Sequence, residues 1–303
     1  MKVFITGGSG FVGIALCRYF LEKGAQVSAT GTSAAHSLIG QENFIYIPAD
    51  TTQQGKWQDA LQEVDMVINL AGRNIFKRWT RSYKNQIYDS RILTTKNLVD
   101  TLPANKKMVF FSASAAGFYG SRGDEILTEE TDSGKGFLAT VCIDWEKEAI
   151  KAKEKGIRVI AMRLGVVLGK EGGALEKMIP AFRFFVGGPI GDGKHWFPWI
   201  HIHDLLSAIQ FLFEKPDIDG PVNFCSPGSI RYKDFSEALG RAMKRPSFFK
   251  TPGFVIKTIM GELGEALLSS QRSVPEKLGA SGFRFQFPDI ESALSDILYF
   301  DKR

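Results

Sequence analysis

A glycine-rich loop near the start of the chain restricts the folds open to this sequence. Residues 7–13 read Gly-Gly-Ser-Gly-Phe-Val-Gly, directly after an apolar run at 2–6 and before an amphipathic stretch at 12–23. Three glycines between a strand and a helix are typical of a loop that binds the pyrophosphate of a dinucleotide. They permit a tight turn and a close approach to phosphate, while free amides at the helix N-terminus face the phosphate oxygens.

Short apolar runs alternate with amphipathic stretches through the first half of the chain. Helical periodicity is clearest over 12–23, 81–101 and 142–155. The predicted strands are 2–6, 26–30, 44–47, 66–70, 108–112 and 159–164. This alternation indicates a parallel sheet covered by helices on both faces. We therefore predict an α/β fold, a Rossmann doubly wound parallel sheet.

The pattern changes after residue 164, where closely spaced glycines interrupt it. Beyond this point we predict helices at 204–214, 233–243 and 253–268 and a strand at 221–225. We assign 1–165, with about 200–230, to a dinucleotide-binding domain. Residues 166–199 and 231–303 then form a smaller, mixed α/β C-terminal lobe that binds substrate.

Composition and charge limit the classes of partner. The 303 residues include 44% hydrophobic and 23% charged residues, which is typical of a packed globular chain. The charge of +5 is dispersed, so we expect a small-molecule substrate and no nucleic acid. The densest basic stretch, 73–91, fits either a solvated helix face or a surface toward an anionic ligand. Oligomeric state is left open, with a homodimer as one possibility.

Cysteine usage and hydropathy bear on the compartment. The three cysteines are far apart and form no metal-ligand spacing, so the sequence predicts neither a disulfide framework nor a metal site. No apolar run is long enough to span a bilayer, and the N-terminus opens on a strand pattern instead of a signal sequence. We expect a cytoplasmic protein with no membrane partner.

The residues after the second strand bear on the choice of dinucleotide. An enzyme that prefers NAD places an acidic residue there to bind the ribose hydroxyls. This chain has Thr30-Gly31-Thr32-Ser33 instead. An acid would repel a 2′-phosphate, so its absence favours NADP as cofactor, although no Arg or Lys is supplied locally. NAD remains the alternative.

Several motifs together resemble a known family. They are TGGSGFVG at 6–13, NLAG at 69–72, SASAAGFYG at 112–120, RLGVVLG at 163–169 and WIHIHDL at 199–205. They resemble an atypical branch of the extended short-chain dehydrogenase/reductases, within the NAD-dependent epimerase/dehydratase superfamily. The most similar family is the one labelled nucleoside-diphosphate-sugar epimerase, and the resemblance covers nearly the whole chain.

The resemblance implies positions for the cofactor. Gly7, Gly10 and Gly13 would bind pyrophosphate, Leu70-Ala71-Gly72 would lie beside the adenosine ribose, and Arg91 near the phosphates. Relatives carry Arg and a polar residue where this chain has Thr32 and Ser33, and Asp50 occupies the adenine-contact position. The complete predicted set is Gly7, Gly8, Ser9, Gly10, Phe11, Val12, Gly13, Thr32, Ser33, Asp50, Leu70, Ala71, Gly72 and Arg91.

Catalytic candidates are harder to assign. In the superfamily a Tyr-x-x-x-Lys pair on the helix after the fifth strand transfers the proton, and a serine binds the substrate oxygen. Residues 136–146 occupy that helix and contain no tyrosine. Ser114, or alternatively Ser112, takes the serine position. Asp144 or Glu146 would supply a carboxylate base if burial raised its pKa, and Tyr119 is interpreted as a packing residue.

Two histidine-containing segments complete the candidates. His201 and His203 lie on one face of a strand without a third ligand, so we interpret them as structural. His195 and Trp196 follow the glycine-rich loop 187–193, and we assign them with Ser114 to a substrate pocket.

Two functions agree with these features. The first is an NADP-binding epimerase or reductase that acts on a carbonyl or nucleotide-sugar-like substrate. The second is a catalytically silent protein that senses NADP, because the dinucleotide loop is intact while the Tyr-Lys pair is missing.

Overall fold

Seven parallel strands form the central sheet, in the order β11-β7-β5-β4-β1-β2-β3. The computed structural model describes residues 1–299. The sheet strands are β1 (Lys2–Thr6), β2 (Gln26–Gly31), β3 (Phe44–Pro48), β4 (Met66–Asn69), β5 (Val109–Ala115), β7 (Arg158–Leu164) and β11 (Gly220–Phe224). The strand order reverses at β1, and doubly wound sheets bind ligands at the carboxyl ends of the strands at such a switch point.

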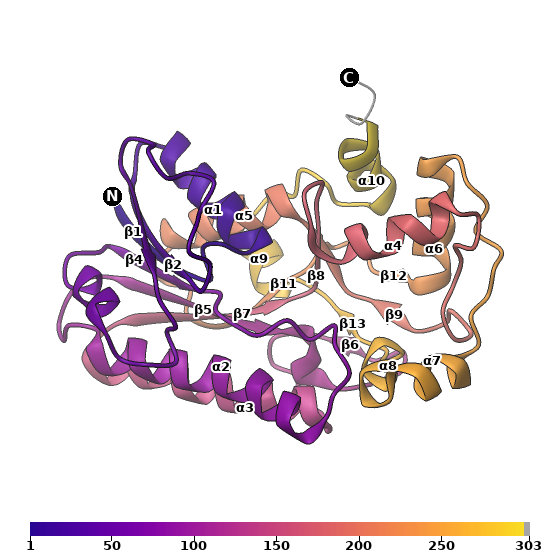
Figure 1. Cartoon of the computed structure of the whole chain (residues 1–303), viewed down its shortest axis with the longest axis horizontal. Coiled ribbons are helices and arrows are strands. Elements are labelled where there is room, and N and C mark those ends of the chain that lie inside the picture. Colours follow the sequence, from indigo (N-terminus) through magenta and orange to yellow (C-terminus); the bar gives the residue numbers. More distant parts are fainter. Residues whose placement is uncertain (300–303) are drawn as a thin grey trace.

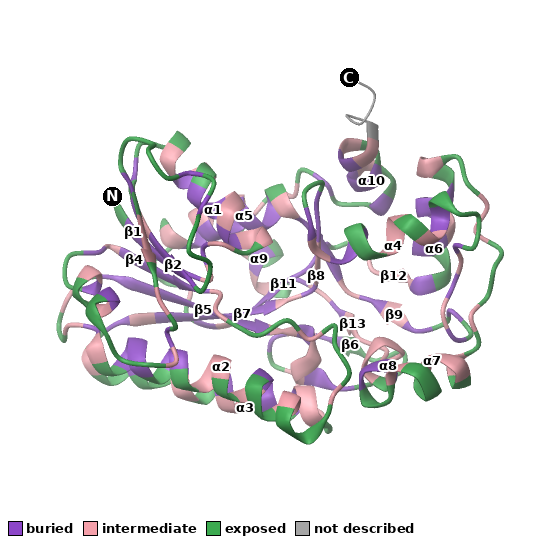
Figure 2. Ribbon diagram, in the orientation of Figure 1, coloured by how far each residue is buried: buried purple, intermediate pink, exposed green. Residues whose placement is uncertain are grey.

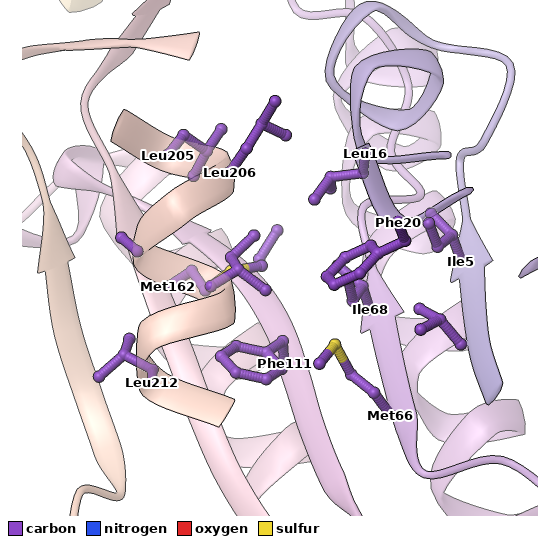
Figure 3. Close-up of a cluster of buried hydrophobic side chains, with 14 of the residues drawn as sticks. Ile5, Leu16, Phe20, Met66, Ile68, Phe111, Met162, Leu205, Leu206 and Leu212 are labelled. Atoms are coloured by element: carbon purple, nitrogen blue, oxygen red, sulfur yellow. The ribbon is translucent and has the colours of Figure 1, made fainter. Parts of the chain in front are cut away.

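Helices cover both faces of this sheet, as Figure 1 shows. The principal ones are α1 (Phe11–Glu22) and α5 (Ile202–Phe213) on one face, and α2 (Arg81–Thr101) and α3 (Phe137–Ile150) on the other. Neighbouring strand residues point to opposite faces, so Phe110 packs in the core with α2 and Phe111 in the core with α1 and α5. Figure 3 shows Leu206 of α5 on the side of Leu16 and Phe20, and Leu205 and Leu212 belong to the same core.

A third hydrophobic core lies in the C-terminal part of the chain, and Figure 2 shows buried residues in purple to the right of the sheet. It includes Leu175 of α4, Trp199, and Phe235 of α6. The elements that contribute to it are β8 (Val166–Leu168), α4 (Gly173–Arg183), β9 (Trp196–Phe197), β10 (Trp199–His201), β12 (Ile230–Arg231), α6 (Tyr232–Met243) and α10 (Ile290–Tyr299). Helices α7 (Gly253–Met260) and α8 (Glu262–Leu267) follow α6 in the chain.

The remaining elements are short. They are η1 (Lys56–Leu61), η2 (Ala116–Tyr119), β6 (Ile126–Leu127), η3 (Lys151–Lys155), β13 (Arg272–Ser273) and α9 (Glu276–Ala280). Leu278 of α9 packs in the same core as α1 and α5. The domain boundaries given above remain a prediction, and this packing adds a contact between the C-terminal region and the large sheet.

The predicted fold class is confirmed, and the differences in the elements have local causes. The single helix predicted over 253–268 is two helices, α7 and α8, because Gly261 between them has φ +60°. This left-handed conformation interrupts a helix and favours glycine. Helix α3 begins at Phe137, five residues before the stretch of clearest helical periodicity and one residue after the start expected from the family resemblance. No helix within residues 1–299 is long and apolar enough to cross a bilayer.

Candidate functional site

The loop after β1 packs at distances that only glycine allows. Gly7 has φ +67°, and a Cβ there would lie 2.9 Å from the carbonyl carbon of Leu70. A Cβ on Gly13 would lie 2.2 Å from the carbonyl oxygen of Gly7, far inside van der Waals contact. The first turn of α1 is therefore held directly against the loop, and the loop against the end of β4.

The N-terminus of α1 is open to an anion. Its N-cap is Gly10, which has no side chain to accept from the first amides, and no acidic residue lies in the first turn. The first amides of a helix have no partner inside it, and the helix dipole adds positive potential there. The loop therefore has the backbone geometry and the polarity that a phosphate requires.

A cleft of about 410 Å³ opens at this end of the sheet. Eight of the predicted cofactor residues line it: Gly7, Ser9, Gly10, Thr32, Asp50, Leu70, Ala71 and Gly72. A hollow of about 540 Å³ lies at the opposite, amino ends of β1, β2 and β3. We regard the 410 Å³ cleft as the candidate site, because parallel sheets bind ligands at the carboxyl ends of their strands.

The residues that form one wall of the cleft are not among those predicted from the sequence. Gln86, Ser90 and Thr94 of α2 line it, together with Arg73 and Asp89. The first three are spaced by four residues, which places polar side chains on one face of a helix. That spacing is readable in the sequence, but it does not indicate which way the helix face points.

Three other predicted cofactor residues, Gly8, Phe11 and Val12, do not line the cleft and pack against neighbouring parts of the fold. Gly8 allows contact with Ala29, since a Cβ would lie 2.6 Å from the Ala29 Cβ. The ring of Phe11 fills the space beside Gly169, Gly172 and Gly173. Val12 packs against the core under α1.

Ser33 is held by its neighbours at the rim. Its hydroxyl donates to the Ala35 carbonyl at 2.8 Å, and its own carbonyl accepts from the Tyr46 hydroxyl at 2.8 Å. Asp50 is exposed in the cleft, where Oδ1 accepts from the backbone and hydroxyl of Thr52 at 3.0 and 2.7 Å.

Arg91 brings a positive charge against the cleft wall. A Cβ on Gly72 would lie 2.9 Å from the guanidinium carbon of Arg91. Its Nη1 donates to the carbonyls of Ile87 at 2.9 Å and Arg73 at 3.2 Å, and the guanidinium lies 5.2 Å from the Trp145 ring. Burial lowers the pKa of Arg91. Within residues 1–299 it has no carboxylate partner, and the hydrogen bonds of Nη1 go to backbone carbonyls.

Ser114 lies at the end of β5 and is part of a buried polar network. Ser114 is 2% exposed, and its hydroxyl donates to Oε1 of Glu146 on α3 at 2.6 Å. Arg163 on β7 donates to both oxygens of Glu146 at 3.0 Å. A ligand contact at Ser114 would therefore use its oxygen as an acceptor.

The face of α3 toward Ser114 contains no tyrosine and no lysine. It presents Leu138, Cys142 and Glu146, which are spaced by four residues; the first two lie against Gly117. Burial raises the pKa of the Cys142 thiol to about 11. This thiol is therefore a poor nucleophile, since the thiolate is the reactive form.

Tyr119 is fully buried behind this network. Its hydroxyl lies 2.7 Å from Oδ1 of Asn223 and 2.9 Å from the carbonyl of Thr128, and it accepts from Nη1 of Arg163 at 3.0 Å. Burial raises its pKa to about 12. The packing interpretation agrees with this environment.

Asp144 points from α3 toward α2 and not toward Ser114. Its Oδ2 accepts from the Tyr88 hydroxyl at 2.9 Å, and burial together with that hydrogen bond raises the pKa of Tyr88. The structure therefore does not bring the two catalytic candidates, Ser114 and Asp144, together. Their catalytic roles remain predictions.

The two pocket candidates of the C-terminal part pack against its own side chains. His195 is 8% exposed and stacks on Tyr232 with ring centroids 4.9 Å apart. The guanidinium groups of Arg231 and Arg272 lie 4.6 and 4.5 Å from the Trp196 ring centroid, and Nε1 of Trp196 donates to Asp124 at 2.8 Å. In the described part of the chain, neither lines the 410 Å³ cleft.

The histidine run 201–204 connects the C-terminal segment to α5. The carboxylate of Asp204 accepts from the amides of Gln286 at 2.7 Å and Phe287 at 3.0 Å. His201 is 1% exposed and caps α5 by accepting from the His203 amide at 3.2 Å. Across residues 1–299 no group of three or more His, Cys, Asp or Glu side chains could hold a metal ion.

The chain matches two family models and is similar in sequence to proteins of plants and bacteria. The family model described as the NAD dependent epimerase/dehydratase family matches residues 3–224, and a domain of unknown function, DUF1731, matches 251–297. A chloroplastic epimerase family protein SDR39U1 homolog of Arabidopsis thaliana is 36% identical over 98% of this chain and 87% of its own length. Epimerase family protein YfhF of Bacillus subtilis is 35% identical over 98% of each chain.

A solved structure agrees over the same extent. Human epimerase family protein SDR39U1 (isoform 2), crystallised with NADPH, superposes with a TM-score of 0.87 at 28% identity and covers 99% of each chain.

Proposed function

This chain belongs to the NAD dependent epimerase/dehydratase family, and from that premise we propose that it binds NADPH in the cleft beside the Gly7–Gly13 loop. We further propose that it acts as an oxidoreductase or epimerase on a small carbonyl or nucleotide-sugar-like substrate. The observation that carries the proposal is the packing of Gly13 against the Gly7 carbonyl, because any side chain at position 13 would clash with the loop. That packing leaves the amides of α1 open toward the cleft.

The residues around the cleft fit a dinucleotide. The loop and the N-terminus of α1 would hold the pyrophosphate, and Leu70, Ala71 and Gly72 would lie along the adenosine ribose. Arg91 would balance phosphate charge, because it is a partly buried cation without a carboxylate partner among residues 1–299.

The rim after β2 supports NADPH over NADH. Gly31 ends the strand and Thr32 is exposed beside it, so the position where an acid would bind a 2′-hydroxyl is neutral. Human SDR39U1, which was solved with NADPH, provides a precedent within the relatives. Arg73 lines the same cleft and supplies a positive charge to it.

When bound, the nicotinamide supplies or accepts a hydride. The chain would contribute Ser114 as a hydrogen-bond acceptor, since its proton is directed to Glu146 at 2.6 Å. Glu146 is held in place by two hydrogen bonds from Arg163. Ser114 would thus orient a substrate hydroxyl, whereas Asp144 would act only after release of Tyr88.

Fluorescence titration tests the first step. The purified protein is titrated with NADPH and with NADH while the nicotinamide emission is followed. We expect saturable binding of NADPH that is much tighter than that of NADH. Absence of binding for both dinucleotides would remove the cofactor proposal and the activity with it.

A second function, binding without turnover, is favoured by one observation. The hydroxyls of Ser114 and Tyr119 and the carboxylate of Asp144 all have partners within the fold. A protein that senses NADPH needs no free acid or base. The two functions are distinguished with NADPH labelled at the transferable hydrogen: stereospecific transfer to a metabolite supports the enzyme, whereas binding without transfer supports the sensor.

A further inference from the structure

We propose that the far end of the C-terminal part docks on an anionic lipid bilayer through exposed phenylalanines surrounded by lysines and arginines. The docking surface, called here the phenylalanine patch, consists of Phe184, Phe185, Val186, Phe248 and Phe249. It lies outside the dinucleotide cleft, and the inference does not depend on the function proposed above. The sequence-based expectation that the protein has no membrane partner stays a prediction, and this proposal is its alternative.

Exposed apolar side chains are concentrated at this end of the molecule. Phe184 is 77% exposed and Phe248 76%, and the other three patch residues are between 48% and 56% exposed. Helix α7 follows directly and adds Phe254 and Ile259, at 72% and 70%. Single exposed apolar residues are normal on a protein, but a group of them marks a contact surface.

Two segments far apart in the sequence form the patch. The Phe249 amide donates to the Gly187 carbonyl at 3.3 Å, and the Thr251 amide donates to Pro189 at 3.0 Å. A Cβ on Gly188 would lie 2.4 Å from the Phe249 carbonyl oxygen, so the two backbones are in close contact. In Figure 1 both segments run along the right-hand edge of the molecule, beside α6 and above α7.

Basic residues predominate in the two segments that form the patch and in the helices beside them. Residues 183–191 and 238–261 contain six basic residues and no Asp or Glu: Arg183, Arg241, Lys244, Arg245, Lys250 and Lys257. Arg241 pairs with Glu291 and Lys257 with Glu265. Within residues 1–299, Lys244, Arg245 and Lys250 have no carboxylate partner.

The basic side chains lie against the aromatic ones. The Arg245 guanidinium is 4.9 Å from the Phe185 ring centroid. Arg241, Lys244 and Arg245 line a surface hollow of about 500 Å³ with Phe248, and Glu237 is the acidic residue in its lining. The same surface therefore offers apolar groups and cations to one partner.

Exposed phenylalanines next to basic side chains favour a lipid surface as the partner of the patch. Phenylalanines enter the boundary between headgroups and acyl chains, while lysine and arginine are attracted to the negative surface of anionic lipids. A second copy of this chain would bring two patches of the same sign together, which charge repulsion opposes. An anionic bilayer satisfies both the apolar and the charged groups.

Vesicle flotation tests the proposal with the full chain. Vesicles of phosphatidylcholine mixed with phosphatidylserine are compared with vesicles of phosphatidylcholine alone, at low and high salt. We expect binding to the mixed vesicles, little binding to the neutral ones, and a loss of binding as salt screens the charges.

Two double variants separate the apolar and charged contributions. Phe184→Ser with Phe248→Ser removes the two most exposed rings, and Lys244→Glu with Lys250→Glu reverses two unpaired charges. We expect each pair to lower the partition coefficient by about tenfold or more. The matched control is Ile45→Ser with Lys107→Glu, two exposed positions outside the patch, which should bind as the parent does. Thermal unfolding followed by circular dichroism confirms that each variant is folded.

Three results would overturn the proposal. They are equal binding by parent and patch variants, no binding to the mixed vesicles, or a concentration-dependent dimer in sedimentation that the phenylalanine variant abolishes without any vesicle binding. The last result would assign the patch to a second copy of the chain.

Discussion

The carboxylate of Glu146 and the guanidinium of Arg163 form a two-point ion pair, Oε1 with Nε and Oε2 with Nη2, each at 3.0 Å. Their side chains are 14% and 5% exposed, so water screens the pair weakly. Burial acts to lower the pKa of Arg163, but the hydrogen bonds and charge of Glu146 outweigh it, and the pKa is raised. The ion pair connects α3 to β7, and Oε1 of Glu146 accepts the hydrogen bond from the Ser114 hydroxyl.

Removing one charge of this pair should destabilise the fold. Arg163→Met leaves Glu146 without its cation and Tyr119 without a donor, and breaking a buried pair costs about 3–5 kcal/mol of unfolding free energy. Urea denaturation measures it. The matched control is Arg18→Met, whose partner Glu171 is 69% exposed, where we expect a change of about 1 kcal/mol or less. Equal effects at both sites would contradict this assignment.

The sheet was predictable because its signals are local. Alternating apolar runs and glycines follow from the period of strands and the needs of the pyrophosphate loop, so the α/β fold could be predicted from short windows of sequence. The resemblance to the epimerase/dehydratase family is confirmed by the matches over nearly the whole chain. The break at Gly261 was missed because glycine within an amphipathic stretch does not reveal the sign of φ.

The candidate site was only partly predictable because its contacts are non-local. Gln86, Ser90 and Thr94 reach the cleft only once α2 packs beside β4 and β5, which no local window specifies. Similarly, the Ser114 hydroxyl contacts Glu146, 32 residues away in the sequence. A motif identifies a residue type at the end of a strand, but not which partner uses its hydrogen-bonding capacity.

Gly13→Ala should abolish dinucleotide binding. The added methyl would lie 2.2 Å from the Gly7 carbonyl oxygen and 2.7 Å from the Gly8 Cα, so the loop must move. We expect no saturable change in NADPH fluorescence and a loss of about 1–3 kcal/mol in unfolding free energy. Gly279→Ala on α9 is the control, since no atom lies within 4 Å of its Cβ position. Unchanged NADPH affinity in the Gly13 variant would show that the loop does not bind the cofactor.

Arg91→Met should separate binding from stability. If the guanidinium interacts with a cofactor phosphate, its loss removes a charge-assisted hydrogen bond and weakens NADPH binding by about tenfold to a hundredfold. Stability should change little, because methionine fills similar volume and no carboxylate among residues 1–299 is left unpaired. Fluorescence titration and urea denaturation measure the two quantities. Lys96→Met, which removes an exposed ion pair on the same helix, should leave both unchanged.

His201 should make stability fall in acid. Burial first, and the charge of His203 second, lower its pKa from 6.5 to about 3 in the folded chain. The unfolded chain therefore binds the proton first as pH falls. The contribution of neutral His201 to the unfolding free energy is fully present above about pH 6.5 and is lost progressively as the pH falls toward about 3.

His201→Asn isolates that effect, because asparagine also accepts from the amide at a helix N-cap. Between about pH 6 and pH 4 the slope of unfolding free energy against pH should become shallower by up to about 1.4 kcal/mol per pH unit. Urea denaturation across this range measures it. Asp296 lies 3.4 Å from Nε2 and is the group that would hold a charged His201 in the fold. Two results would contradict this prediction: a strong loss of stability in Asp296→Asn near pH 6, and an unchanged slope in His201→Asn. Together they would show that His201 is charged in the native state and that burial does not determine its pKa.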